Sequence, residues 1–286
     1  LSVLVFIPLQ YISCMYYGIY GLVTTLIVVT IATIAVNYLQ YDKLSNNKAS
    51  GLWNKWFGVM ELFKVQNKKI AIVVVLYNPT KDDVNMILSL SSIYSFFIVD
   101  NTEFPNISFT QYSNIYYVCN NTNLGIAEAQ NIALKKIMEY DYDYVVFLDQ
   151  DSRVPDEYCS LIVHEFIRID NGRLAAIGPI VYNKENGNAY KSIIHRYSMS
   201  TDAFSCRNHI ISSGSCISVK AIKEIGLMDS VMFIDYVDYE WCWRALAKGY
   251  FCGVTNNLSI YHRVGQRELS IGIYKVIISA PQRYFY

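Results

Sequence analysis

Short apolar runs alternate with amphipathic stretches through the middle of the chain. The β-branched run at residues 70–76 closes at Asn-Pro-Thr, and similar runs predict further strands at residues 96–99, 115–118, 144–148 and 175–180. The intervening stretches predict helices over residues 81–90, 126–139 and 155–169. Strand–helix units in this succession favour an α/β fold with a doubly wound, mainly parallel sheet and flanking helices.

The pattern becomes looser after residue 182. Gly and Asn turns over residues 182–207 indicate a hairpin or an insertion. A strand-like stretch at residues 210–219 is interrupted by Ser-Ser-Gly-Ser at residues 212–215. A helix over residues 239–247 and a strand at residues 258–262 complete the predicted elements.

The beginning of the chain is different in character. Residues 1–41 contain no Asp, Glu, Lys or Arg, and residues 16–39 are apolar apart from four threonines and one asparagine. Because about 20 apolar residues cross a bilayer, this segment predicts an N-terminal apolar transmembrane helix. Upstream sequence included by a start-site error, ahead of Met60, is the alternative.

A basic and aromatic linker follows at residues 42–69, with Lys43, Lys48 and Lys55 close behind the apolar segment. By the positive-inside rule, this charge places the remainder of the chain in the cytoplasm, against the membrane surface. The formal charge of the whole chain is zero, which gives no support for a nucleic-acid partner. Seven cysteines without a CxxC pair indicate reduced thiols rather than a disulfide framework or a zinc site.

The most informative chemistry follows the apolar run at residues 144–148, where Asp149-Gln150-Asp151 begins. Such an uninterrupted run is typical of a strand buried on both faces of an α/β sheet. Ligands of these sheets bind at the carboxyl ends of the strands, and two carboxylates can hold Mg²⁺ or Mn²⁺ and through it a diphosphate. The pattern therefore predicts a metal-dependent enzyme that acts on a phosphorylated substrate.

Several motifs in order resemble those of the inverting family 2 glycosyltransferases. They are Asp100-Asn101, Asn123-Leu124-Gly125, Leu148-Asp149-Gln150-Asp151-Ser152, the Ser/Gly loop and Phe233-Ile234-Asp235-Tyr236-Val237-Asp238-Tyr239-Glu240-Trp241. The Asp-Gln-Asp-Ser form and the Asp-x-x-Asp-x-Glu-Trp-Cys-x-Arg signature are similar to the bacterial rhamnosyltransferase branch, whose members build O-antigen and related cell-surface polysaccharides. The resemblance implies a GT-A glycosyltransferase domain over residues 70–286. Family members generally continue beyond a segment like the last residues here, so a C-terminal truncation is an open alternative.

The resemblance also implies roles for individual residues. Asp238 matches the catalytic base, which removes the acceptor proton in a single inverting displacement. Asp151 and His262 match ligands of the divalent metal, Mg²⁺ or Mn²⁺. The positions that match the nucleotide-sugar site are Leu76, Tyr77, Asn78, Asp100, Asn123, Gly125, Asn131 and Asp149, and those near the acceptor are Ser213, Gly214 and Asp235.

The expected reaction is transfer of L-rhamnose from dTDP-rhamnose, or of a sugar from a UDP-sugar, to a lipid-linked saccharide at the cytoplasmic face of the bacterial inner membrane. One rival is a metal-dependent phosphatase of the haloacid dehalogenase type, with Asp149 as nucleophile. Three predicted strands before Asp149 and the lack of a later Gly-Asp-x-x-x-Asp speak against it. The other is a non-catalytic or truncated membrane-associated protein that keeps the fold.

Simpler interpretations exist for some of these residues. Asp235 and Asp238 stand at a predicted helix start, where carboxylates are favoured by capping alone. Glu240 and Arg244 have the spacing of an ordinary helix-surface ion pair. Trp241 and Trp243 are interpreted as packing residues, Arg153 as a phosphate contact or a solvated loop residue, and His262 as a metal ligand or a structural histidine.

Overall fold

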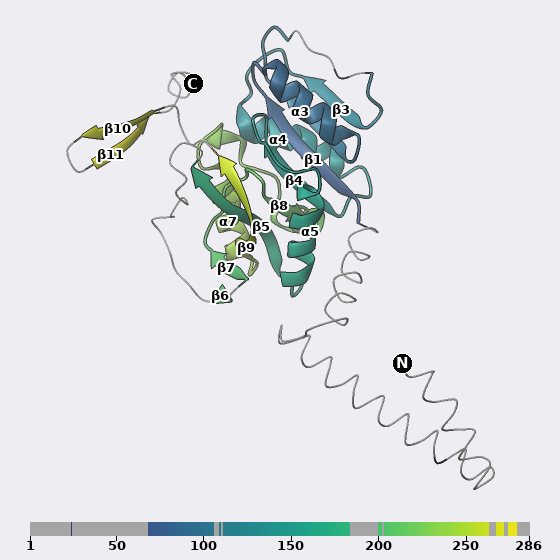
Figure 1. Ribbon diagram of the computed structural model, residues 1–286, viewed down its shortest axis with the longest axis vertical. Helices are drawn as coiled ribbons and strands as arrows, with labels where there is room; N and C mark the ends of the chain where they lie inside the picture. Colours follow the sequence, from purple (N-terminus) through teal and green to yellow (C-terminus); the bar gives the residue numbers. More distant parts are fainter. Residues whose placement is uncertain are drawn as a thin grey trace. The chain divides into compact units, whose positions relative to one another are not determined.

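The computed structural model describes residues 24, 68–105, 109, 111–183, 200–201, 203–262, 267–271 and 274–278. The chain divides into two compact units, Leu1–Phe63 and Lys64–Tyr286. Nearly all described residues belong to the second unit, and Figure 1 draws the described residues in colour. In that described part, no helix is long and apolar enough to span a bilayer. The predicted membrane segment at residues 1–41 and most of the linker at residues 42–69 lie outside it.

The first half of the second unit is a run of parallel strands with connecting helices. It contains β1 (Ile70–Leu76), α3 (Lys81–Ser91), β2 (Ser95–Asp100), β3 (Ile115–Cys119), α4 (Gly125–Ile137), β4 (Tyr144–Asp149) and α5 (Tyr158–Ile169). Strand β1 pairs in parallel with β2 on one side and β4 on the other, and β2 pairs in parallel with β3. These elements confirm the strand–helix alternation predicted from the apolar periodicity.

The second half adds strands of both directions. Its elements are β5 (Leu174–Asn183), β6 (Ser200–Thr201), β7 (Phe204–Arg207), β8 (Cys216–Ser218), α6 (Val219–Ile225), the 3₁₀ turn η1 (Ser230–Met232), α7 (Val237–Ala247) and β9 (Phe251–His262). The described sheet has the order β3-β2-β1-β4-β8-β5-β9-β7-β6. A separate antiparallel pair, β10 (Arg267–Ile271) and β11 (Tyr274–Ile278), follows.

The sheet is mixed but mostly parallel, as predicted, with strand β8 antiparallel to both β4 and β5. One sequence prediction needs correction here. Only residues 216–218 of the predicted strand at 210–219 are extended, because Ser218 caps the short helix α6 by accepting a hydrogen bond from the Ala221 N–H at 3.0 Å. The β6–β7 hairpin agrees with the turn-rich pattern of that region.

Helices cover both faces of the sheet and give the unit three layers (Figure 1). Alternate residues of β1 point to opposite faces, as in any strand. Ala71 and Val73 contribute to the core formed with α4, α6 and α7, whereas Ile72 and Val74 contribute to the core formed with α3 and α5. Burial on both sides explains why the strands read as nearly continuous apolar runs.

The layers bring the carboxyl ends of β1, β2 and β4 to one edge of the sheet. In register, Leu76 pairs with Asp100 and Val75 pairs with Asp149, so the last residues of the three strands lie level with one another. The chain moves outward from β1 to β3 and then returns to the other side of β1 with β4. This reversal of strand order is the place where ligands bind in open α/β sheets.

Candidate active site

The loop after β4 is tied to the loop after β1 by the side chain of Gln150. The Tyr77 N–H donates to Gln150 Oε1 at 2.8 Å, and Gln150 Nε2 donates to the Tyr77 carbonyl at 3.3 Å. The Gln150 amide therefore satisfies both the N–H and the carbonyl of Tyr77. The middle residue of the Asp-Gln-Asp sequence thus joins the predicted nucleotide segment to the predicted metal segment, a role that the sequence did not reveal.

Ser152 fixes the turn that carries the two carboxylates. Its hydroxyl accepts from the Asp149 N–H at 2.9 Å, and its own N–H donates to the Asp149 carbonyl at 3.0 Å. Asp149 is partly buried at the end of β4, whereas Asp151 is exposed on the turn. Arg153, which follows, pairs with Asp83 at 3.0 Å. It therefore ties this turn to α3 while its own side chain stays 45% exposed.

Asp238 occupies the first turn of α7 with its carboxylate held by main-chain donors. Its Oδ2 accepts from the Ser212 N–H and its Oδ1 from the Tyr239 N–H, both at 2.9 Å. Burial raises the pKa of Asp238 to about 6, the two N–H donors oppose the rise, and the negative charge of Asp149 adds to it. A carboxyl group with this pKa is a competent proton acceptor near neutral pH.

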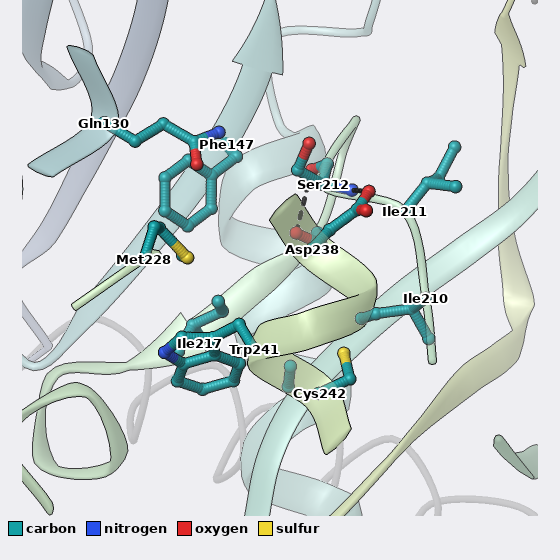
Figure 2. A pocket seen from close by; sticks show the side chains of 12 residues that line it. Gln130, Phe147, Ile210, Ile211, Ser212, Ile217, Met228, Asp238, Trp241 and Cys242 are labelled. Carbon is teal, nitrogen blue, oxygen red and sulfur yellow. Dashed lines mark hydrogen bonds between the residues drawn. The ribbon is translucent and has the colours of Figure 1, made fainter. Parts of the chain in front are cut away.

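The Asp238 carboxylate is buried by the walls of a small pocket. Asp238 and Ser212 lie at a small pocket whose other walls are mostly apolar, as Figure 2 shows for Phe147, Met228 and Trp241. Apolar walls disfavour the charged form of a carboxyl group, which is the physical cause of the raised pKa. The pocket lining also includes Gln130, which was not among the predicted site residues.

The Ser/Gly loop between residues 212 and 215 is shaped by close contact with β4 and α5. Gly214 has φ of +70°, and a Cβ there would lie 2.6 Å from the Tyr158 hydroxyl oxygen. The Gly214 N–H donates to the Phe147 carbonyl at 2.8 Å, and the Tyr158 hydroxyl donates to the Gly214 carbonyl at 2.7 Å. The loop presents the Ser212 N–H to Asp238, while the Ser213 hydroxyl is buried without a hydrogen-bond partner.

The predicted loop at Asn123 and Gly125 is a second place where the backbone tolerates no side chain. Gly125 has φ of +78°, and a Cβ there would lie 2.6 Å from both the ring and the carbonyl oxygen of Phe233. Asn123 Oδ1 accepts from the Gly125 N–H at 3.0 Å, and Asn101 Nδ2 donates to the Gly125 carbonyl at 3.0 Å. The Ala127 N–H donates to the Phe233 carbonyl at 3.0 Å, which holds the start of α4 against the segment that precedes Asp238.

Two predicted nucleotide residues are engaged inside the protein. Asp100 is 1% exposed, and its carboxylate accepts from the Thr102 N–H and the Tyr117 hydroxyl, both at 2.9 Å. Asn131 donates to the Met228 carbonyl and accepts from the Met228 N–H, both at 2.9 Å. Their side chains hold the walls of the site, and a nucleotide contact by either stays a prediction. Leu76 is buried, and its carbonyl accepts from the Asn101 N–H at 2.8 Å, while Asn78 is exposed with φ of 48°.

The metal prediction rests on Asp149 and Asp151. Among the described side chains, no group of three or more His, Cys, Asp or Glu residues is placed to hold a metal ion. The two carboxylates nevertheless fit Mg²⁺ or Mn²⁺ chemically, because such ions are commonly bound by one or two carboxylates together with substrate phosphates. The charge of Asp149 already disfavours ionisation of Asp238, so a cation beside it would stabilise both. The His262 side chain lies outside the described part, and its role stays a prediction.

The simpler interpretations have mixed outcomes. Arg244 donates to Glu240 at 2.8 Å and to the Leu227 carbonyl at 2.7 Å, which confirms the ion pair. Trp241 is 1% exposed and its indole donates to the Gly226 carbonyl, so it is a packing residue as predicted. Trp243 is 47% exposed and its ring contacts those of His209 and Tyr239, so the packing interpretation holds for part of its side chain. Asp235 is exposed on the loop just ahead of α7.

Comparison with known proteins gives a family match for the part of the chain that carries the site. Residues 144–271, which include both the Asp-Gln-Asp turn and Asp238, match the family described as glycosyl transferase family group 2. The resemblance noted from the motifs is thereby confirmed for these residues.

Individual relatives give a finer view. The chain is 28% identical over 234 residues to the dTDP-rhamnosyl transferase RfbF of Shigella flexneri, covering 77% of each protein. It is 22% identical over 191 residues to the low-salt glycan biosynthesis hexosyltransferase Agl10 of Haloferax volcanii, covering 62% of this chain and 61% of that protein. Among solved structures, GalNAc-T7 with UDP, GalNAc and Mn²⁺ is similar in fold, with a TM-score of 0.51 and 15% identity over 69% of this chain and 44% of that one.

Proposed function

We propose that the chain transfers L-rhamnose from dTDP-rhamnose to a lipid-linked saccharide, with inversion, in the synthesis of a cell-surface polysaccharide. The observation that carries the proposal is Asp238, a carboxylate with pKa raised to about 6 that faces the same site as Asp149. Similarity to a dTDP-rhamnosyl transferase over 77% of the chain supports the choice of donor.

In the proposed reaction, Asp238 accepts the proton of an acceptor hydroxyl as that oxygen attacks the anomeric carbon of the donor. The new carbon–oxygen bond forms while the bond to the nucleoside diphosphate breaks, and the diphosphate departs with the electron pair. The Ser212 and Tyr239 N–H groups hold the carboxylate in one orientation, so its proton-accepting oxygen is pre-positioned. Base catalysis of this kind contributes roughly 10²–10⁴-fold to the rate.

Mg²⁺ or Mn²⁺, held by Asp151 and Asp149, would supply positive charge that stabilises the departing diphosphate. The chain's own residues prepare that place. Ser152 fixes the turn that carries both carboxylates, and Gln150 keeps the turn beside the Tyr77 main chain, where the nucleotide is proposed to lie. His262 is proposed as a further ligand, and Asp235 as an acceptor contact.

We place the reaction at the cytoplasmic face of the bacterial inner membrane. The support is the uncharged segment at residues 1–41 and the lysines that follow it. A lipid-linked acceptor suits a transferase at that surface. The nucleotide-sugar site is proposed to use the Tyr77–Asn78 loop and the Asn123–Gly125 loop as well as Asp149.

A transfer assay on the full 286-residue chain tests the proposal. We expect release of dTDP from dTDP-rhamnose in the presence of Mn²⁺ and a bacterial lipid extract, together with a labelled lipid product. Asp238→Asn is expected to abolish the product, while Asp141→Asn, an exposed aspartate at the opposite end of β4, leaves it unchanged. Full product formation by Asp238→Asn would overturn the mechanism. Phosphate release from simple phosphomonoesters would instead support the phosphatase.

A further inference from the structure

One flank of α7 carries aromatic side chains that the proposed mechanism does not use. Tyr239 and Trp243 are four residues apart and share one side of the helix, and Tyr236 at its N-cap, with φ of 64°, has its ring against that of Tyr239. Tyr236 is 62% exposed and Trp243 is 47% exposed, while Tyr239 between them is partly buried. Exposed aromatic groups gathered in this way mark binding surfaces more often than scattered single ones do.

His209 completes an ordered cluster with these three residues. Its ring centroid lies 3.9 Å from that of Tyr239, with an angle of 31° between the planes, and 6.4 Å from that of Trp243, at 90°. The Tyr236 and Tyr239 rings meet edge to face at 5.6 Å. Because each ring contacts another, the cluster is held in place before anything binds, which lowers the entropy cost of binding.

The cluster is continuous with the candidate base. The N–H of Tyr239 donates to the Asp238 carboxylate at 2.9 Å. Burial and the charge of Asp238 raise the pKa of the Tyr239 hydroxyl, so the phenol and the carboxylate are close enough to interact. A molecule whose hydroxyl reaches Asp238 therefore has this aromatic surface directly beside it.

We propose that His209, Tyr236, Tyr239 and Trp243, here called the aromatic surface, bind a sugar ring of the acceptor. A pyranose ring has an apolar C–H face and a polar edge of hydroxyl groups. Aromatic side chains match both, since each ring presents an apolar face and each of these four residues carries a polar atom that can form hydrogen bonds. The inference rests on the proposed function, because it takes the hydroxyl at Asp238 to belong to a saccharide.

The aromatic surface positions the acceptor and takes no part in bond breaking. It would hold the ring that carries the attacking hydroxyl, or its neighbour, while Asp238 receives the proton. Loss of one aromatic group should therefore raise the acceptor concentration needed for half-maximal rate, without changing the binding of the nucleotide at the far side of Asp238. This separation of effects distinguishes a positioning role from general damage to the fold.

The test uses the full chain with methyl rhamnoside, methyl glucoside, methyl N-acetylglucosaminide and the corresponding disaccharides. Saturation-transfer NMR detects weak binding of these probes, which have no lipid tail. We expect Trp243→Ala and Tyr236→Ala to weaken binding of at least one probe by roughly tenfold, as truncation of an exposed aromatic anchor does. Tyr140→Ala is the matched control, because Tyr140 is 52% exposed on the turn after α4.

Four outcomes are decisive. Unchanged saccharide binding in both variants overturns the inference, as does the absence of saccharide binding by the wild type, whatever the nucleotide does. Reduced partitioning of Trp243→Ala onto vesicles of phosphatidylethanolamine and phosphatidylglycerol, without a change in saccharide binding, would assign the surface to the membrane and also overturn it. Failure of dTDP binding alongside normal saccharide binding would reject the proposed donor and leave the aromatic surface supported.

Discussion

Asp238, the proposed base, is a carboxyl group whose ionised form costs stability. Its pKa is raised to about 6 because mostly apolar walls and the charge of Asp149 surround it, while the Ser212 and Tyr239 N–H groups and its own main-chain N–H oppose the rise. The ionised form is therefore costly in the folded protein, yet it is the form that accepts a proton.

The pH dependence of transfer should report this group. With the acceptor at saturating concentration, we expect kcat/KM for the donor to rise as pH increases through about 6 and to level off above it. The reason is that the base is active when deprotonated. A pH–rate profile between pH 4.5 and 8 measures this. A flat profile across that range would remove Asp238 from the role of base.

The same residue predicts a gain in stability when it is neutralised. An Asp pKa raised from 3.8 to about 6 stabilises the folded state fully only below pH 4, and that contribution is lost as pH rises through 6. Asp238→Asn should therefore increase the free energy of unfolding by roughly 1–3 kcal/mol at pH 8 and by little at pH 4. Urea denaturation at both values tests this. A loss of stability at pH 8 would contradict it.

Gln150 gives a prediction about the nucleotide. Gln150→Ala removes both hydrogen bonds to the Tyr77 main chain, whereas Gln150→Glu keeps an acceptor for the shorter one, at 2.8 Å. We expect the alanine variant to weaken dTDP binding roughly tenfold, since an unmade buried hydrogen bond costs about 1–3 kcal/mol. The glutamate variant should lie between it and the wild type in calorimetry. Equal affinities in all three would separate Gln150 from the donor site.

At the scale of elements, α4 begins where two backbone segments meet. Gly125 and Gly249 share a φ of +78°, but a Cβ at Gly125 would collide with Phe233, while nothing lies within 4 Å of one at Gly249. The pair therefore separates the cost of the left-handed conformation from the cost of the collision. Both substitutions to alanine incur the first cost, which is about 1 kcal/mol.

We expect Gly249→Ala to lower the free energy of unfolding by about 1 kcal/mol, and Gly125→Ala to lower it by roughly 2–4 kcal/mol. Because Phe233 precedes α7, only the second variant should also reduce transfer activity. Chemical denaturation and the transfer assay measure the two effects. Similar losses of stability in both variants would show that the Phe233 segment moves aside at little cost.

The sequence predicted the elements whose periodicity is governed by burial. The strands at β1 and β4 read as uninterrupted apolar runs because both faces are covered, and Asp149 and Asp151 followed at the expected edge. It missed α6, because Val219-Lys-Ala-Ile follows a real strand without a break and the Ser218 cap was read as part of that strand. The sequence analysis also missed strands β10 and β11.

The residues of the site were predictable only where their type fixed their role. Asp149 was singled out because it follows a buried strand, whereas Asp238 was assigned through the family resemblance, since capping alone favours a carboxylate at a helix start. Asn131 was assigned to the nucleotide by position alone, whereas its amide joins α4 to Met228. Gln150 and His209 act through partners 73 and 30 residues away in the chain, and no local pattern encodes such distances.

At the scale of the whole molecule, the second unit combines two sets of side chains on one sheet edge. The loops after β1 and β4 supply Tyr77, Asp149 and Asp151, and α7 with the Ser/Gly loop supplies Asp238 and Ser212. The charge of Asp149 acts on Asp238, so the two sets face one another. The proposed inverting transfer needs such an arrangement, with the donor on one side of the reacting carbon and the acceptor on the other.

Calorimetric titration of the full chain with dTDP, UDP and GDP, with and without Mn²⁺, tests this account most directly. We predict that dTDP binds in the presence of Mn²⁺, that removal of the metal weakens binding, and that Asp151→Ala abolishes the metal dependence while Asp141→Ala does not. Binding of no nucleotide by the folded protein would contradict the account, as would dTDP binding that is indifferent to both Mn²⁺ and Asp151.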